Sequence, residues 1–366
     1  MKTFPLIRVQ GSPNERGKRI GEKAGEYIIH NIETYRKILL EMGNISWSEA
    51  RKFAEQYIQN IAEYDQEILD EIIGISEGSG QHLLDIMALN ARSEILLNSD
   101  GCTSMAFVPK ATESRETWLA QNWDWSPEIN PGVILLEIDQ TPRPNILMAT
   151  EAGIVGKIGL NSEGLGVCLN LLGPEHNTMR GVPIHIILRG ILNSSSISQA
   201  IGQIARAERG TAANFLIADG EGSAFNVEST STDFDVLFPD EGMLCHTNHF
   251  TSSQLKVVDT GRVKFPDTYL RLWRCRELLN NSSEKMNWNR IKSILADHHG
   301  YPDSICRHGN NIPTDLGRMA ASNTVFSIIM NLSSKSFEIT NGEPCSAEYV
   351  PYIPEWSCRK HIKTKI

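Results

Sequence analysis

A glycine and a cysteine, Gly101 and Cys102, stand where a long helix-like stretch of the sequence gives way to short apolar runs. A cysteine at such a place can be a buried core residue, half of a disulfide, a metal ligand or a nucleophile. A thiol approaches the carbonyl of a preceding glycine at low steric cost, because glycine has no side chain. The pair therefore motivates the hypothesis that the chain cleaves itself at this bond.

Cleavage between Gly101 and Cys102 would proceed by an N-to-S acyl shift. The Cys102 sulfur attacks the Gly101 carbonyl to give a thioester, and water then releases residues 1–101. The new α-amino group of Cys102 has a reference pKa of about 7.7–8, which suits base catalysis near neutral pH. A cysteine that uses its own amine as base is an N-terminal nucleophile. Position alone favours the alternative that Cys102 is an ordinary buried strand residue.

The other cysteines and the histidines do not form a recognisable metal site in the sequence. No CxxC spacing occurs, so a disulfide framework and a cysteine-rich zinc site are both disfavoured. Neither His246 with His249 nor His298 with His299 has a zinc-hydrolase spacing such as HExxH. We therefore expect no metal and no cofactor, and a metal hydrolase is kept as a minor alternative. The cysteines are Cys102, Cys168, Cys245, Cys275, Cys306, Cys345 and Cys358.

Composition excludes several classes of function. The 366 residues carry a net charge of −9 and are 40% hydrophobic, as expected of one large or two medium globular domains. No basic face is evident, so nucleic acid is not expected as a partner. The N-terminus lacks the apolar stretch of a signal peptide, and no window is long and apolar enough to span a membrane. With reduced thiols, these features predict a cytoplasmic protein.

The elements that would position Cys102 change character at that residue. Residues 14–98 show apolar side chains at helical spacing, and Ser46 or Ser48 is a plausible N-cap for the second helix. From Cys102 onward, short alternating runs separated by Gly, Asn and Pro predict strands and hairpins, with helices over 183–208 and 268–298. Residues 102–366 are therefore predicted to form one α+β unit, on which the helical segment packs or before which it stands.

Five sequence blocks, in order along the chain, resemble the acyl-CoA:6-aminopenicillanate acyltransferase family, which are self-processing cysteine N-terminal nucleophile hydrolases. The third block is also similar to a strand–turn–strand shared with the penicillin V acylase and bile-salt hydrolase group. The resemblance implies a four-layer αββα fold, in which two antiparallel sheets pack face to face with helices outside. It also implies two parts after cleavage, a helical segment 1–101 and a core 102–366. The blocks are "GSPNERGKRIGE", "DGCTSMAF" followed by "AQNWDW", "IGLNSEGLGVCLNLL", "CHTNHF" and "DHHGYPDSICRH".

The resemblance implies four catalytic residues. Cys102 is the nucleophile, and Asp124 binds its α-ammonium group or steers its proton. The side-chain amide of Asn248 donates to the oxyanion, a contribution of a few kcal/mol per donor in acyl transfer. Arg307 lies near the nucleophile, where it anchors a carboxylate or favours the thiolate. The alternatives are a turn or capping aspartate, a turn asparagine and a surface salt bridge.

Three further residues are weaker candidates for substrate binding. Asn170 matches a pocket asparagine of the wider group. Asn122 is two residues before Asp124 and would point to the same face of a strand. Cys306 is the neighbour of Arg307 and is a candidate for lining the pocket.

The sequence thus predicts a self-processing amidohydrolase or acyltransferase. Its acyl-enzyme would form from an amide or thioester and be resolved by water or an amine, with small N-acyl amino acids, acylated amines or dipeptide-like amides as substrates. Two alternatives stay open, an acyl-CoA-dependent N-acyltransferase and an uncleaved, non-enzymatic binding protein. Segment 1–101 is expected to stay bound after cleavage, because its amphipathic helices would otherwise expose apolar surface. Whether the chain forms a homo-oligomer is left open.

Overall fold

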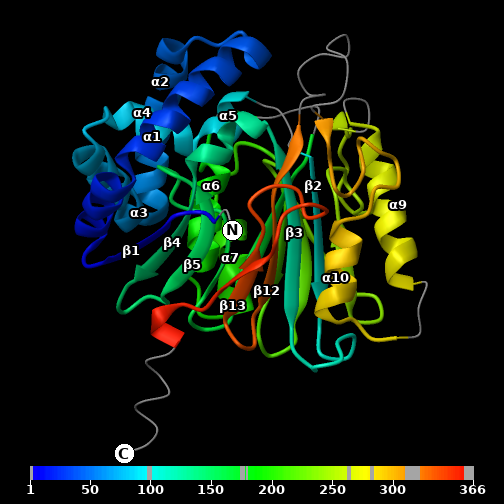
Figure 1. Cartoon of the computed structure of the whole chain (residues 1–366). Coiled ribbons are helices and arrows are strands. Elements are labelled where there is room, and N and C mark those ends of the chain that lie inside the picture. The colour runs from blue at the N-terminus through cyan, green and yellow to red at the C-terminus, as the bar shows by residue number, and fades with distance from the viewer. Residues whose placement is uncertain are drawn as a thin grey trace, which may run out of the picture.

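Two β-sheets face each other at the centre of the molecule (Figure 1). The computed structural model describes residues 3–96, 101–173, 178, 180–261, 265–280, 284–309 and 322–357.

The larger sheet has eight strands in the order β1-β4-β5-β6-β7-β8-β9-β10. Neighbouring strands are antiparallel except for β1, which lies parallel to β4 at one edge. The strands are β1 (Leu6–Gln10), β4 (Val133–Asp139), β5 (Ile146–Glu151), β6 (Ile158–Asn161), β7 (Gly166–Leu171), β8 (Ala213–Ala218), β9 (Ala224–Ser229) and β10 (Phe234–Leu237).

The smaller sheet is antiparallel throughout, in the order β11-β2-β3-β12-β13-β14. Its interior strands β2 and β3 are buried at every position, because the larger sheet covers one face and helices cover the other. The strands are β2 (Gly101–Phe107), β3 (Trp118–Trp125), β11 (Met243–His246), β12 (Asn323–Asn331), β13 (Ser336–Ile339) and β14 (Val350–Tyr352).

Helices form the outer layers. Helices α6 and α7 pack on the larger sheet, with α3 against α6, while α9 and α10 pack on the smaller sheet (Figure 1). The α+β, four-layer αββα arrangement that the resemblance implied is therefore confirmed. The helices are α1 (Pro13–Gly43), α2 (Trp47–Glu55), α3 (Tyr57–Ser79), α4 (Leu83–Asn90), α5 (Arg92–Leu96), α6 (Ile184–Leu192), α7 (Ile197–Arg206), α9 (Asp267–Asn280) and α10 (Trp288–Leu295), and a 3₁₀ helix spans Pro127–Gly132.

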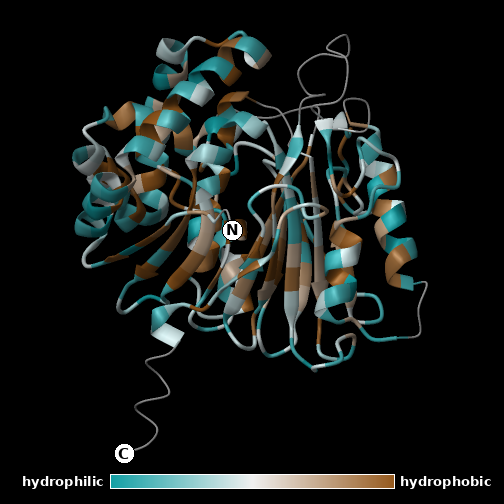
Figure 2. Cartoon of the chain, viewed as in Figure 1, coloured by the Kyte–Doolittle hydropathy of each residue, from teal (hydrophilic) through white to brown (hydrophobic). Residues whose placement is uncertain are grey.

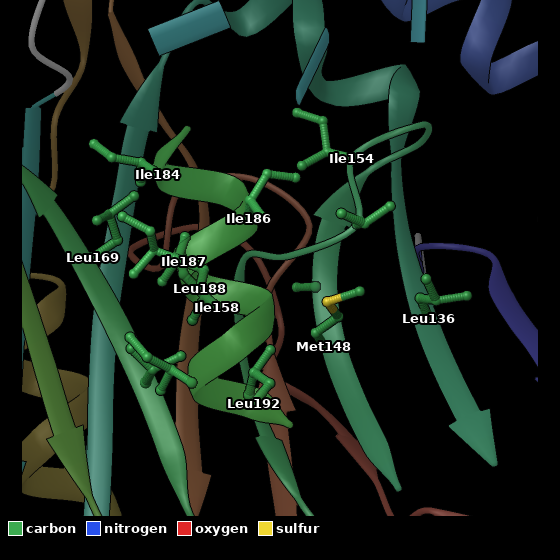
Figure 3. Close-up of a cluster of buried hydrophobic side chains, with 14 of the residues drawn as sticks. Leu136, Met148, Ile154, Ile158, Leu169, Ile184, Ile186, Ile187, Leu188 and Leu192 are labelled. Carbon is green, nitrogen blue, oxygen red and sulfur yellow. The ribbon is translucent and has the colours of Figure 1, made fainter. Parts of the chain in front are cut away.

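The apolar residues concentrate in the strands and on the inward faces of the helices (Figure 2). Helix α6 is buried at all nine positions, because it lies between the larger sheet and α3. Seven of the nine residues are apolar or glycine, and the two polar ones, His185 and Arg189, are buried with them. Its isoleucines and leucines pack against Met148 of β5, Ile158 of β6 and Leu169 of β7 (Figure 3).

The first hundred residues pack on the rest of the chain and contribute to its larger sheet. The helical prediction for 14–98 is confirmed up to residue 96, where the described part of the segment ends, and Ser46 is the serine that caps α2. Strand β1 was not predicted. Asn31 of α1 fixes the segment to the core, because its Nδ2 donates to the carbonyls of Gly132 (3.0 Å) and Ala152 (2.9 Å).

Helices α1 and α3 cross at very close range through glycines of both helices. A Cβ built on Gly17 would lie 2.0 Å from the Glu71 carbonyl oxygen, and one on Gly78 would lie 2.0 Å from the Lys18 carbonyl oxygen. Only glycine permits this contact of backbone with backbone. No described helix is both long and apolar enough to cross a bilayer.

Candidate active site

The register of β2 and β3 brings the predicted scissile bond next to Asp124. Gly101 pairs with Asp124, and Cys102 pairs with Trp123. Both strands are interior and fully buried, so the Gly101–Cys102 peptide lies inside the smaller sheet and is screened from bulk water. Antiparallel pairing by itself therefore places a carboxyl group beside the glycine whose carbonyl would be attacked.

Three side chains hold the backbone of Cys102. Its N–H donates to Asn248 Oδ1 at 2.8 Å. Its carbonyl oxygen accepts from Arg271 Nη1 at 2.7 Å and from Asn170 Nδ2 at 3.3 Å. Asn170 belongs to β7 of the facing sheet, so the two sheets clamp this peptide between them. The prediction that Asn170 lies in the site is consistent with this geometry.

Asn248 follows β11 and presents the acceptor side of its amide to Cys102. Its Oδ1 also accepts from Arg271 Nη2 at 3.0 Å, while its Nδ2 donates to the Leu171 carbonyl at 3.1 Å. The hydroxyl of Thr268 fixes the residue from behind, because it accepts from the Asn248 N–H at 2.8 Å. Oxyanion stabilisation would need the donor side instead. In this state of the chain Asn248 is positioned to hold the Cys102 nitrogen.

Asp124 has a buried carboxyl group, one oxygen of which accepts a hydrogen bond. Its Oδ1 accepts from the Thr324 hydroxyl at 2.7 Å. Its Oδ2 lies 3.7 Å from Arg307 Nε, and neither of these two atoms has a hydrogen-bond partner among the residues that the structure describes. Burial raises the pKa of Asp124 to about 7, although the positive charges of Arg307 and Arg271 act to lower it. This carboxyl group can therefore take up or release a proton near neutral pH.

Arg307 packs directly against the glycine of the scissile bond. A Cβ built on Gly101 would lie 3.1 Å from Arg307 Nε, so a larger residue there would press on the guanidinium. Burial lowers the pKa of Arg307, but the carboxylates of Asp267, Asp124 and Asp303 outweigh burial and raise it. Its Nη1 donates to Asp303 at 2.8 Å, and its Nη2 is paired with Asp267. The residue is therefore a fixed cation, close enough to interact electrostatically with Cys102.

Two residues of the site, Arg271 and Asp267, were missed in the sequence analysis. They lie four residues apart at the start of α9, and Arg271 Nε donates to Asp267 Oδ2 at 2.9 Å. Asp267 also accepts from Arg307, so it joins both arginines. The charge pair at helical spacing was visible in the sequence. The sequence contained no signal that the pair would point at Cys102 instead of at solvent.

Asn122 and Cys306 both lie near Arg307 but make different contacts. Asn122 Nδ2 donates to the carbonyls of Leu295 and Ile305, both at 2.8 Å, and so fixes the segment that carries Arg307. Cys306 is buried, and its sulfur lies 3.3 Å from His308 Nε2. Through these contacts Asn122 and Cys306 support the segment that carries Arg307. The sequence predicts both as weaker substrate-binding residues.

The charges of the site are nearly balanced and buried. Burial raises the pKa of Asp267, but Arg271 and Arg307 outweigh burial and hold that pKa below its usual range. Two arginines thus face Asp267 and Asp303, which are paired with them, and Asp124, whose pKa is raised to about 7. Arginine side chains beside a cysteine favour its thiolate over its thiol. The arrangement can activate a cysteine sulfur and can stabilise negative charge that develops beside it.

Comparison with known proteins matches the chain to a sequence family and to a relative of the same name. Residues 111–344 match the sequence profile of the family "acyl-coenzyme A:6-aminopenicillanic acid acyl-transferase". The chain is 27% identical over 344 residues to the 40 kDa form of acyl-coenzyme A:6-aminopenicillanic-acid-acyltransferase from Emericella nidulans, covering 92% of each chain.

Two solved structures are similar at low sequence identity. A variant of conjugated bile acid hydrolase from Clostridium perfringens is 14% identical with a TM-score of 0.48, and the match covers 69% of this chain and 96% of that one. Penicillin V acylase from Agrobacterium tumefaciens is 12% identical with a TM-score of 0.39, and the match covers 66% and 83%.

Proposed function

The chain belongs to the acyl-coenzyme A:6-aminopenicillanic acid acyl-transferase family, and from this premise we propose that it cuts its own Gly101–Cys102 bond and then uses Cys102 as an N-terminal nucleophile. The observation that carries the proposal is the set of contacts around this one peptide. Asn248 and Arg271 hold Cys102 on one side of the bond, and Asp124 and Arg307 flank Gly101 on the other.

The cleavage step assigns a task to each of these groups. The Cys102 sulfur bonds to the Gly101 carbonyl carbon, and its proton passes to the Asp124 carboxylate. The negative charge on the former carbonyl oxygen develops beside Arg307, whose Nε–H is not engaged by another described acceptor. The Cys102 nitrogen then takes a proton and leaves as an amine, which leaves a thioester between Gly101 and the sulfur. Water hydrolyses the thioester, restoring the thiol and releasing the Gly101 carboxylate.

Asn248 supports the leaving nitrogen during this step. Its Oδ1 already accepts from the Cys102 N–H, and it can keep doing so when the nitrogen becomes an ammonium or amine. The predicted contact between Asp124 and the ammonium group gives way, in this proposal, to a contact with Asn248. The oxyanion role expected for the Asn248 amide would require its Nδ2 to leave the Leu171 carbonyl after cleavage.

After cleavage we propose that the released segment 1–101 stays bound. Glu71 of α3 accepts from Arg189 of α6 at 2.7 and 2.8 Å, and Arg92 of α5 donates to Glu151 of β5 at 3.1 Å. All four side chains are buried. These ion pairs cross from the segment to the core, and cutting one peptide bond leaves them intact.

The mature enzyme would then hydrolyse or transfer the acyl group of a small amide or thioester. Cys102 attacks the carbonyl with its own amine as base, and water or an amine resolves the acyl-enzyme. The name of the Emericella nidulans relative supports an acyl-CoA-dependent N-acyltransferase as the second candidate. Turnover of an N-acyl amino acid in water, compared with transfer from an acyl thioester to an amine, separates the two.

The experiment that tests self-cleavage is an intact mass of the purified chain, with N-terminal sequencing. We expect two chains, one of which begins at Cys102. The Cys102→Ala variant should remain a single chain without activity, whereas Cys168→Ala should process normally. Cys168 is a suitable control because it is a buried cysteine that faces Cys102 from β7. A processed and active Cys102→Ala protein would overturn the proposal.

A further inference from the structure

Four ligand groups converge on the segment that carries Arg307, and no step of the proposed mechanism uses them. The ligand atoms of His298, Cys306, His308 and Cys345 all lie within 4.8 Å of one another. They come from three segments of the chain, one after α10, one before β12 and one after β13. We propose that these four residues bind a structural Zn²⁺ ion.

The three distances from His308 to the other ligand atoms fit a tetrahedral site. His308 Nε2 lies 3.0 Å from His298 Nε2, 3.3 Å from Cys306 Sγ and 3.5 Å from Cys345 Sγ. Zinc with bonds of about 2.0–2.1 Å to nitrogen and about 2.3 Å to sulfur separates tetrahedral ligands by about 3.3 Å for a nitrogen pair and about 3.5 Å for nitrogen and sulfur. The observed separations agree with these values to within a few tenths of an ångström.

Hydrogen bonding alone does not account for this convergence. An imidazole Nε2 has either one hydrogen or one lone pair in the ring plane, so it forms one good hydrogen bond, as donor or as acceptor. His308 Nε2 nevertheless faces a second imidazole nitrogen and two sulfur atoms at hydrogen-bond distance. A cation at the centre would be a partner for all four atoms at once.

The donor set selects the metal. Two sulfurs and two imidazole nitrogens in tetrahedral arrangement are typical of zinc, whereas magnesium and calcium prefer oxygen ligands. Four protein ligands leave no open position for water or substrate, which is the pattern of a structural site. The proposal departs from the expectation, drawn from the sequence spacing, that the chain holds no metal. Cys345 lies 37 residues from His308, too far along the chain for a spacing motif to connect them.

The backbone already holds the ligand segment in place. Cys306 N–H donates to the Asp297 carbonyl at 3.0 Å, and His308 N–H donates to the Pro302 carbonyl at 3.0 Å. Between these two ligands lies Arg307, whose backbone exchanges hydrogen bonds with Thr324 at 3.0 and 3.1 Å. A zinc ion bound on both sides of Arg307 would fix the peptide that carries this residue to the connection between β13 and β14.

The test measures metal directly and needs no substrate. The full chain is purified under reducing conditions, its zinc is counted by elemental analysis, and the metal is then exchanged for Co²⁺. We expect one zinc per chain, and a cobalt spectrum with tetrahedral d–d bands and a sulfur-to-metal charge-transfer band. Both measurements are independent of self-cleavage, so their results do not depend on whether the proposed function is correct.

Two pairs of variants show which residues bind the metal. Cys345→Ser and His298→Gln change exposed ligands, so they open no cavity in the core, and each should lower zinc affinity by at least about tenfold. Cys245→Ser and His299→Gln change a cysteine and a histidine outside the cluster and should leave affinity unchanged. Unaltered zinc affinity in both ligand variants would overturn the proposal. So would a wild-type chain that takes up neither zinc nor cobalt, or that carries a Cys306–Cys345 disulfide instead.

Discussion

Asp124 occupies a place where a carboxyl group is costly to ionise. Burial raises its pKa to about 7 from an ordinary value near 3.8, so the folded chain holds this proton more tightly than the unfolded chain does. The ionised form becomes common only as the pH rises through about 7. Proton transfer from Cys102 to Asp124 requires that ionised form.

Self-cleavage should therefore accelerate as the pH rises through about 7. At lower pH Asp124 is protonated and cannot accept the thiol proton. The Asp124→Asn variant should cleave slowly at every pH and lose this dependence, while circular dichroism shows it folded. The measurement is the rate of appearance of the shorter chains on a gel across pH 5 to about 9, an ordinary range for general-base profiles. A wild-type rate that does not change with pH would remove Asp124 as the base.

Replacing Arg271 should slow cleavage as strongly as replacing one of the catalytic residues predicted from the sequence. It donates to the Cys102 carbonyl and to Asn248 Oδ1, so its loss removes a charged donor from both groups. Arg271→Met should slow cleavage by about 100-fold or more, the range seen when one preorganised donor is removed from an active site.

The matched control for this prediction is Arg274→Met. Arg274 lies on the same helix but pairs with Asp297, away from Cys102, and its loss should leave the cleavage rate within about twofold. Equal rates for Arg271→Met and wild type would show that the contact with Cys102 is structural only.

At the scale of single residues, the sequence predicts the members of the site only where they lie in short motifs. Cys102, Asp124, Asn248 and Arg307 each stand in a block that resembles the family, and the structure brings all four together. Arg271 lies in no such block, and a lone charge pair on an amphipathic helix is most often on a solvated face. Its direction is decided by how α9 packs on β2 and β11, which is a tertiary property.

At the scale of elements, the crossing of α1 and α3 depends on glycines and gives a stability prediction. Gly17→Ala places a Cβ against the Glu71 carbonyl and should lower the free energy of unfolding by about 1–3 kcal/mol, the usual cost of overpacking. Chemical denaturation monitored by circular dichroism measures the change.

Gly25 provides the control on the same helix. A Cβ built there meets nothing within 4 Å, so Gly25→Ala should raise the free energy of unfolding by about 0.5–1 kcal/mol through helix propensity alone. Two substitutions of the same chemistry are thus expected to act with opposite sign. A Gly17→Ala variant as stable as Gly25→Ala would show that α1 and α3 can separate without cost.

The periodicity of the sequence predicted the strands and helices closely, apart from the short edge strands β1 and β14. Strand β1 is only five residues long, lies at a sheet edge and runs almost directly into α1. Its pairing partner β4 is more than a hundred residues away along the chain. A short run of this kind gains its structure from the partner strand, and no local signal distinguishes it from a loop.

At the scale of the whole molecule, buried charges connect the segment 1–101 to the core. Glu71 is paired with Arg16 of the segment and with Arg189 of the core, and all three side chains are buried. Burial raises the pKa of Glu71, but the two arginines outweigh burial and hold that pKa below its usual range. Glu71 is therefore the shared counter-charge of two buried guanidinium groups.

Glu71→Gln should therefore cost about 3–5 kcal/mol of stability, because it leaves two buried guanidinium groups without a counter-charge. In the cleaved protein, the two chains should separate at a lower denaturant concentration, which size-exclusion chromatography at increasing urea measures. Glu67→Gln is the control, since Glu67 is half exposed and pairs only at the surface with Arg143. Identical separation midpoints for the two variants would remove Glu71 from the interface.

The parallel pairing of β1 with β4 has a consequence for assembly. Once the chain is cut, one sheet would be shared by two polypeptides that never had to find each other. Such a heterodimer has a fixed one-to-one composition and no concentration dependence of assembly, because its quaternary contacts formed as tertiary contacts. Its core chain alone would present the unpaired edge of β4 to solvent, a site for aggregation. If the chain is cut as proposed, this geometry requires that it folds as a single chain before it is divided.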